Sequence, residues 1–263
     1  MDVANKIVWI TGASSGIGEA MAYAFAKKDA RLILSARRVD ALEKVKANCK
    51  NPSLVSVLPL DLAKVNELET IVKTAITLNG HIDILVNNGG ISQRSEARET
   101  SPDVYRNIME INFFGTIHLS NLVMKHFLER NAGYFVVISS ITGKLGLPLR
   151  TAYTASKHAI EGFYASLRTE IWETNLQILM VRPASIKTNI AKNALVGDGT
   201  TFNKADQVID KGITPESLAQ SIIRAVETNK KTLTAGPKAQ VFIVWLNRFL
   251  PGLVFNIVKK LKP

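Results

Sequence analysis

The stretch KIVWITGASSGIG, residues 6–18, passes from an apolar strand directly into a glycine-rich turn. Gly12, Gly16 and Gly18 stand where the next helix would begin. Glycine lets the backbone approach a ligand closely, and the first turn of a helix offers free N–H groups to an anion. The spacing is longer than the common G-x-G-x-x-G fingerprint but of the same design. It predicts a loop that binds a dinucleotide pyrophosphate; a turn that binds nothing is the alternative.

Apolar runs of strand length alternate with longer amphipathic runs along most of the chain. The strand patterns are apolar on both faces, which is typical of a parallel sheet covered by helices on each side. Such strands need right-handed helical crossovers, so the pattern predicts a Rossmann-type, doubly wound α/β fold of about seven strands. The predicted strands lie at 6–12, 31–37, 54–60, 82–88, 133–140, 176–183 and 232–236, and the predicted helices at 17–28, 41–48, 65–76, 104–129, 152–173 and 215–228.

No repeat or linker divides this pattern, so one dinucleotide-binding domain over residues 1–263 is expected. It ends in an apolar and basic extension of amphipathic helices over about residues 237–263. Two irregular stretches, 91–100 and 188–214, follow strands at the edge where doubly wound sheets bind ligands.

The formal net charge of +11 is spread along the chain without a basic block or interleaved aromatic residues, so no nucleic-acid partner is expected. The single Cys49 excludes a disulfide framework and has no partners for a metal site; we expect a surface or half-buried thiol. The N-terminal residues enter an apolar strand too early for a signal peptide. A cytoplasmic protein without a metal is the expectation.

GASSG at residues 12–16 also matches the G-x-S-x-G nucleophile elbow of serine hydrolases, with Ser14 as nucleophile. In that fold the elbow comes late in the sheet, and an acid and a histidine follow it. Here it follows the first strand, and all four histidines precede the last strands or lie in predicted helices. A serine hydrolase is therefore the alternative rather than the main hypothesis.

The second predicted strand ends in Ala36, Arg37 and Arg38, about 20 residues after the glycines. An NAD-binding protein would carry an acid there for the ribose 2′-hydroxyl, whereas a guanidinium pairs with a 2′-phosphate. The sequence favours NADP(H). Two arginines that merely extend into solvent are the alternative.

In YTASK, Tyr153 and Lys157 stand four residues apart within a helical pattern. This spacing places a phenol and an ammonium on one helical face, where they can act together. Such a pair more often marks a solvated face. Here it follows a strand that ends in serine, Ser139 or Ser140, and a dinucleotide loop, so a catalytic pair is predicted.

Over roughly residues 5–235 the chain resembles the short-chain dehydrogenase/reductase family, through seven motifs in the family's order. The ARR stretch and the apolar tail look most like the branch that contains 11-beta-hydroxysteroid dehydrogenase and dehydrogenase/reductase family member 7. Two positions depart from the pattern: Gly89 stands where the family usually has alanine, and Ala184 stands where it usually has glycine. The motifs are TGASSGIG (11–18), Asp61-Leu62, NNGG (87–90), EINFFG (110–115), VISSITG (137–143), YTASK (153–157) and RPASIKT (182–188).

This resemblance implies that Tyr153 is the general acid and base at a carbonyl oxygen, with Ser140 bonded to the same oxygen. Lys157 would hold the nicotinamide ribose and lower the pKa of Tyr153, and Asn112 would position a water that relays protons. Alternation along the strand and the thirteen-residue step to Tyr153 favour Ser140 over Ser139. The predicted NADP(H) contacts are Gly12, Ser14, Ser15, Gly16, Ile17, Gly18, Arg37, Arg38, Asp61, Leu62, Asn88, Gly89, Gly90, Tyr153, Lys157, Pro183, Ala184, Ile186 and Thr188.

The implied substrate is a small carbonyl compound or alcohol, and the implied assembly a homodimer or homotetramer. The expected walls suit a lipophilic molecule, although nearby basic residues suit an anionic head group equally. A catalytically silent NADP(H) sensor is a third hypothesis, disfavoured by the intact set of four catalytic residues. The expected walls are Ile91, Ile141, Leu145, Leu147, Leu195, Val196 and Phe202, and the basic residues are Arg94, Lys144, Lys187 and Lys192.

From Thr228 to Pro263 the chain has seven basic residues and no acidic one. Pro251-Gly252 divides its apolar stretches, and neither reaches the ~20 residues of a membrane span. These helices must pack on their own subunit, on a dimer partner or on a lipid surface as a peripheral contact. The apolar residues concerned are Val241, Trp245, Phe249, Phe255 and Val258, and Lys259, Lys260 and Lys262 would meet anionic lipids.

Overall fold

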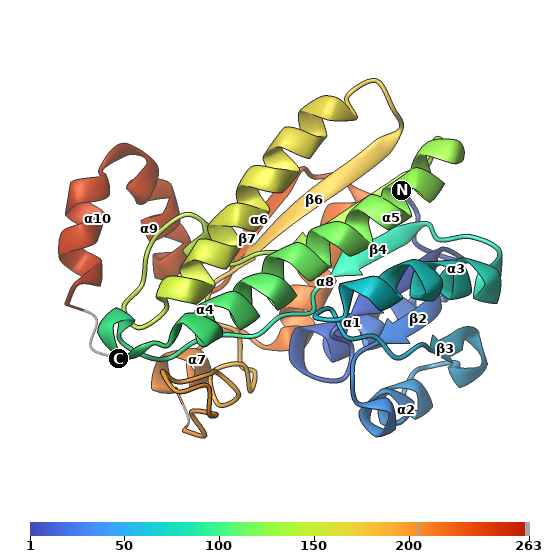
Figure 1. Ribbon diagram of the computed structural model, residues 1–263. Helices are drawn as coiled ribbons and strands as arrows, with labels where there is room; N and C mark the ends of the chain where they lie inside the picture. The colour runs from blue at the N-terminus through green and yellow to red at the C-terminus, as the bar shows by residue number, and fades with distance from the viewer. Residues whose placement is uncertain (205, 261–263) are drawn as a thin grey trace.

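The computed structural model describes residues 1–204 and 206–260, and its centre is one parallel sheet with strand order β3-β2-β1-β4-β5-β6-β7 (Figure 1). Helices cover both faces of the sheet, which confirms the doubly wound fold. All seven predicted strands are present. They are β1 (Ile7–Thr11), β2 (Arg31–Ser35), β3 (Val55–Val57), β4 (Ile84–Asn87), β5 (Gly133–Ile138), β6 (Leu176–Pro183) and β7 (Thr232–Ala235).

Each of the six predicted helical segments forms a helix, but two of them are not α-helical over their whole length. The segment predicted at 65–76 begins with a 3-10 turn, Val65–Glu67, and the long helix at 104–129 is interrupted by a π-helical turn, Glu110–Gly115. The helices are α1 (Gly16–Lys27), α2 (Val39–Ala47), α3 (Leu68–Asn79), α4 (Pro102–Met109), α5 (Thr116–Glu129), α6 (Thr151–Glu170), α7 (Gln207–Asp210), α8 (Pro215–Glu227), α9 (Lys238–Phe249) and α10 (Pro251–Val258).

The alternation of side chains along β1 shows why its sequence is apolar throughout. Val8 and Ile10 enter one core, which α1, α2 and α8 cover, and Ile7 and Trp9 enter the other, which α3, α5 and α6 cover. Because a strand directs successive side chains to opposite faces, burial on both sides requires an unbroken apolar run.

Cys49 is also buried in the first core, so the expected surface or half-buried thiol is wrong.

The strand order reverses between β1 and β4, and the crevice for ligands in such sheets opens at this point. Loops after β1, β4, β5 and β6 therefore meet at one edge. The segment after β6 returns across this edge, where Ile186 forms a β-bridge with Ile213. This arrangement brings together motifs that are far apart in the sequence.

Candidate active site

The glycine-rich loop after β1 is tightly packed against the loop after β4. Gly12 has φ +63°, and a Cβ on it would lie 2.8 Å from the Cα atom of Gly89. A Cβ on Gly18 would lie 2.2 Å from the carbonyl oxygen of Gly12. Only glycine avoids both the strain and the overlap. The loop thus leads into the N-terminus of α1, whose cap residue Ser15 makes no side-chain hydrogen bond to it, and the first turn of a helix has N–H groups free for a pyrophosphate.

Thr11 and Asn88 hold these two loops together. The Thr11 hydroxyl accepts hydrogen bonds of 3.0 Å from the backbone N–H groups of Asn88 and Gly89, and it donates to the carbonyl of Val86. The Asn88 amide donates to the carbonyl oxygens of Thr11 and Gly12. The Asn88 side chain therefore shapes the loop itself. Sequence reasoning had treated it only as a cofactor contact.

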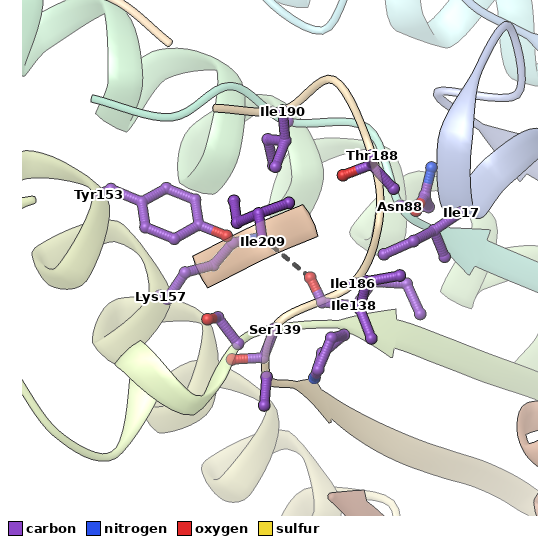
Figure 2. A pocket seen from close by; sticks show the side chains of 14 residues that line it. Ile17, Asn88, Ile138, Ser139, Tyr153, Lys157, Ile186, Thr188, Ile190 and Ile209 are labelled. Atoms are coloured by element: carbon purple, nitrogen blue, oxygen red, sulfur yellow. Dashed lines mark hydrogen bonds between the residues drawn. The ribbon is translucent and has the colours of Figure 1, made fainter. Parts of the chain in front are cut away.

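Tyr153 and Lys157 lie one turn apart near the start of α6 and face the same pocket (Figure 2). Both residues are buried. The Lys157 ammonium donates a 2.9 Å hydrogen bond to the carbonyl oxygen of Ile138 and lies 5.7 Å from the centroid of the Tyr153 ring. The predicted pairing of phenol and ammonium on one helical face is present.

Ser139 and Ser140 both line the pocket at the end of β5. The Ser140 hydroxyl accepts a 3.1 Å bond from the N–H of Thr142. Burial raises the pKa of Tyr153, and hydrogen bonding with the Ser140 hydroxyl opposes that rise. The Ser139 hydroxyl is buried and has no partner among the described residues. Ser140 is thus the serine coupled to Tyr153, as alternation along the strand predicts.

Asn112 lies in the π-helical turn between α4 and α5, and its amide is held on three sides. Its Oδ1 accepts from the N–H of Ile91 at 2.8 Å, and its Nδ2 donates to the Ile91 carbonyl and to the Ser156 hydroxyl. These bonds tie the loop after β4 to α6 beside Lys157. The water-positioning role of Asn112 stays a prediction.

The electrostatics of Tyr153 differ from the expectation that Lys157 lowers its pKa. Burial raises the pKa of Tyr153, and the groups that oppose this rise are the Arg150 guanidinium and the Ser140 hydroxyl. Burial also lowers the pKa of Lys157 to about 8, while the Glu161 carboxylate acts in the opposite direction. The Lys157 ammonium is instead directed to the Ile138 carbonyl. Arg150 is the cation that acts on the phenol, and sequence reasoning missed it.

Glu161 forms a second buried group that sequence reasoning missed. Both of its carboxylate oxygens accept 2.8 Å bonds from the Arg182 guanidinium on β6, and the Lys144 ammonium lies 3.1 Å from Oε2 of the same carboxylate. Glu161 follows Lys157 by one helical turn, and that spacing is the signal that could have revealed it. The carboxylate thus connects α6, β6 and the loop after β5.

Arg94 and Arg150 share the carboxylate of Asp206, which is buried. Arg94 also lies over the ring of Phe202, 5.4 Å from its centroid. Arg94 was one of the basic residues considered for an anionic head group. In the structure it attaches the segment after β6 to the loop after β4.

The structure brings many of the predicted cofactor residues to one pocket and places the others nearby. Arg37 and Arg38 are exposed just after β2, and Asp61 and Leu62 follow β3 along the same edge. The predicted substrate walls do not line this pocket, whose further apolar residues are Ile138, Ile190 and Ile209. Predicted contacts that line it beside Tyr153 and Lys157 are Ile17, Asn88, Gly90, Pro183, Ala184, Ile186 and Thr188.

The geometry contradicts the serine hydrolase alternative. His81 and His126 lie at the amino end of β4, at the sheet edge opposite Ser14. There His126 accepts a hydrogen bond from the N–H of Ile82, and His81 contacts Asp83. His118 and His158 are exposed on α5 and α6. Among the described residues, therefore, no histidine is placed to activate Ser14.

A sequence model of the family described as short chain dehydrogenase matches residues 6–197. The chain belongs to the short-chain dehydrogenase family. Its similar relatives include a dehydrogenase/reductase SDR family protein 7-like from Anopheles gambiae, 39% identical over 97% of this chain and 83% of the relative. Dehydrogenase/reductase SDR family member 7 from Homo sapiens is 37% identical over 99% of this chain and 78% of the relative. These names support the predicted branch.

Among solved structures, a short chain dehydrogenase/reductase from Burkholderia phymatum in complex with NAD superposes with a TM-score of 0.84. It is 20% identical, and the match covers 96% of each chain. At this identity the comparison shows the fold of a short-chain dehydrogenase.

Local packing explains the two departures from the short-chain dehydrogenase pattern. A Cβ on Gly89 would lie 2.8 Å from Cδ1 of Leu62, the end of a flexible side chain. Ala184 has its Cβ where Gly236, at φ +152°, leaves space; a Cβ on Gly236 would lie only 2.5 Å from it. Gly236, which follows the neighbouring strand β7, thus provides the space that the Ala184 methyl group needs.

Proposed function

We propose that this protein is an NADP(H)-dependent oxidoreductase that interconverts a carbonyl group and a secondary alcohol on a lipophilic small molecule. The observation that carries the proposal is the meeting of Tyr153, Lys157 and Ser140 in one pocket beside the glycine loop. A proton donor beside a carbonyl oxygen and a dinucleotide loop are together what hydride reduction needs. The solved relative with NAD supports a nicotinamide dinucleotide in this crevice.

A bound nicotinamide supplies or accepts the hydride at the substrate carbon. In the reducing direction the Tyr153 phenol donates its proton to the carbonyl oxygen, and the Ser140 hydroxyl holds that oxygen. In the oxidising direction Tyr153 accepts the proton again. Burial has the largest effect and raises the pKa of Tyr153, which keeps the phenol protonated for donation, while Arg150 and Ser140 act in the opposite direction. The Lys157 ammonium, fixed to the Ile138 carbonyl in the same pocket, would hold the nicotinamide ribose.

The preference for NADP(H) rests on Arg37 and Arg38. Both side chains are exposed at the end of β2, and neither forms an ion pair within the described residues. Two unpaired guanidinium groups at the ribose position attract a 2′-phosphate. Asp40, the nearest acid in the sequence, lies within α2 rather than at the strand end. A lipophilic substrate is supported by the apolar character of Ile138, Ile190 and Ile209 around the pocket.

The test uses purified protein and two measurements. Titration with NADPH and NADH, followed by nucleotide fluorescence, is expected to give tighter binding for NADPH. Absorbance of NADPH, followed with a panel of ketones, aldehydes and quinones of increasing apolar area, is expected to show turnover that rises with that area. Tight NADPH binding without turnover on any carbonyl or alcohol would instead support the silent sensor.

A further inference from the structure

The hairpin of α9 and α10 carries an apolar surface that the described part of the chain leaves uncovered. In Figure 1 the two helices lie side by side at one end of the molecule, beyond α6 and β7. Seven large hydrophobic residues on the two helices and at the turn between them are exposed, within a span of only sixteen positions: Phe242, Trp245, Phe249, Leu250, Leu253, Phe255 and Ile257. An exposed cluster of this size marks a surface for interaction.

The aromatic residues of α9 form a continuous row. Phe242, Trp245 and Phe249 share one helical face and are 56%, 58% and 60% exposed. Their rings contact each other, with centroids 5.7 Å apart for the first pair and 5.1 Å for the second. The row is therefore preformed and directed outward. Of the residues expected to pack on their own subunit, on a dimer partner or on lipid, Trp245 and Phe249 are left uncovered by their own subunit.

In α10 the apolar residues divide between two faces. Val254 and Val258 are buried, so Val258 packs on its own subunit, which is one of the three roles expected for the tail. Leu253 and Ile257 lie on the other face and are 49% and 37% exposed. The face with Val254 and Val258 is covered, whereas the face with Leu253 and Ile257 is open to a partner.

The charge of this region has one sign. From Thr228 to Pro263 the sequence contains no acidic residue. Lys238, Arg248, Lys259 and Lys260 are exposed, and the Lys259 ammonium lies 5.5 Å from the centroid of the Phe255 ring. Lys262, which was also expected to contribute, lies outside the described residues. Aromatic residues beside lysines suit the boundary between lipid headgroups and acyl chains.

We propose that the α9–α10 hairpin docks this protein on the surface of an anionic lipid bilayer. The aromatic row and the outer face of α10 enter the headgroup boundary, and the basic residues contact lipid phosphates and carboxylates. Face-to-face pairing with a second copy would bring the same cations together without acidic partners, which disfavours that occupant. Within residues 1–204 and 206–260 no helix combines the length and apolarity needed to span a bilayer. The contact is therefore peripheral.

Two hydrogen bonds connect the hairpin to the rim of the pocket. Gln240 accepts from the N–H of Ser185 at 2.9 Å, and Asn247 donates to the carbonyl of Lys144 at 2.8 Å. Ser185 directly follows the lining residues Pro183 and Ala184. Docking therefore holds the pocket beside the lipid surface. If the proposed function is right, a lipophilic substrate can enter the pocket from that surface.

The test is co-sedimentation of the full chain with vesicles, which does not depend on activity. Vesicles of phosphatidylcholine with 0, 15 and 30% phosphatidylserine, values on the order of those in cell membranes, are mixed with protein at low and high salt. Bound protein is expected to increase with phosphatidylserine and to decrease with salt. Protein that stays in the supernatant with all vesicles at low salt overturns the proposal.

Matched variants assign the contact to the hairpin. Trp245→Ser with Phe249→Ser is expected to abolish most binding, whereas Trp172→Ser, which removes a 75% exposed tryptophan beyond the end of α6, leaves it unchanged. Lys259→Ala with Lys260→Ala is expected to weaken binding about 30-fold, at roughly 1 kcal/mol for each basic residue. Lys44→Ala with Lys46→Ala on α2 is its control.

Equal loss in the variants and their controls overturns the assignment to the hairpin. Sedimentation velocity without lipid gives a further check. If the Trp245 and Phe249 change converts a dimer to a monomer and leaves vesicle binding intact, the surface is an interface between copies and the proposal is wrong. Circular dichroism of each variant excludes loss of fold as the cause.

Discussion

The ammonium of Lys157 is bonded to the carbonyl oxygen of Ile138, at the last residue of β5, over 2.9 Å. This bond fixes a buried cation between a strand end and the Tyr153 ring (Figure 2). Burial lowers the pKa of Lys157 to about 8. The lysine is therefore held in place at a cost to its charged form.

Tyr153→Phe is expected to lower kcat by about two orders of magnitude or more, because it removes the transferable proton and keeps the ring. Binding of NADPH is expected to stay within about threefold of the unchanged protein, since the pocket keeps its shape. Steady-state kinetics on a confirmed substrate and a fluorescence titration check the two parts. Near-normal turnover would assign the general acid to another group.

Replacing Ala36 by Asp and Arg37 by Ala is expected to reverse the cofactor preference. A charge-assisted contact to the 2′-phosphate contributes roughly 1.5 to 3 kcal/mol, so NADPH should bind at least about tenfold tighter than NADH before the change. The ratio of the two dissociation constants, measured in both proteins, tests this. Equal affinities in the unchanged protein would contradict the role of Arg37.

Glu161→Gln is expected to lower the free energy of unfolding by on the order of 2–4 kcal/mol, because Arg182 loses its buried ionic partner. The Glu161 carboxylate also raises the pKa of Lys157, so its removal moves that pKa below about 8. Activity falls when Lys157 loses its proton, so the alkaline limb of the pH–activity profile should move to lower pH in this variant. Glu170→Gln, on the exposed part of α6, is the control and should change neither the urea midpoint nor the pH profile.

Lys157→Met is expected to abolish turnover and to remove a pH dependence of stability. The folded pKa of about 8 lies below that of an unfolded lysine, about 10.4. Between these values the unfolded chain binds the proton and the native protein does not, so native stability rises with pH. The stability difference between the unchanged protein and the methionine variant should therefore shift by about 2 kcal/mol between pH 7.5 and pH 9.5.

Urea unfolding at these two pH values measures that shift directly. Other titrating groups occur in both proteins and cancel in the difference. A difference that does not change with pH would mean that Lys157 keeps an ordinary pKa in the folded state.

Gly12→Ala and Gly89→Ala are expected to behave oppositely, although both lie in the same pair of loops. Alanine at 12 requires a left-handed backbone and meets the Gly89 backbone at 2.8 Å, so stability and NADPH binding should both be lost. Alanine at 89 has its one close contact, 2.8 Å, with the end of the flexible Leu62 side chain, and it restores the family's usual residue. Thermal melts with and without NADPH compare the two. Equal damage from both substitutions would contradict this account of the loop.

Most of the fold follows from local pattern. The seven strands, the helices between them and the glycine loop are determined by apolar periodicity and by residues such as Gly12, which act through their own backbone. The sequence by itself also determined that Tyr153 and Lys157 share a helical face, since four residues make one turn. It could not show the π-helical turn at Glu110–Gly115, because that turn depends on the bonds of Asn112 to a loop twenty-one positions earlier.

Only the tertiary structure decided the electrostatics of the site. The Arg150 guanidinium acts on Tyr153, and Arg182 reaches Glu161 from another strand. The pairing of Arg94 with Asp206 joins segments more than a hundred positions apart. Such contacts depend on the strand order and on the path of the loop after β6, neither of which has a local signature. Burial shifts the pKa of these groups, and burial is a property of the packed sheet and helices rather than of residues adjacent in the sequence.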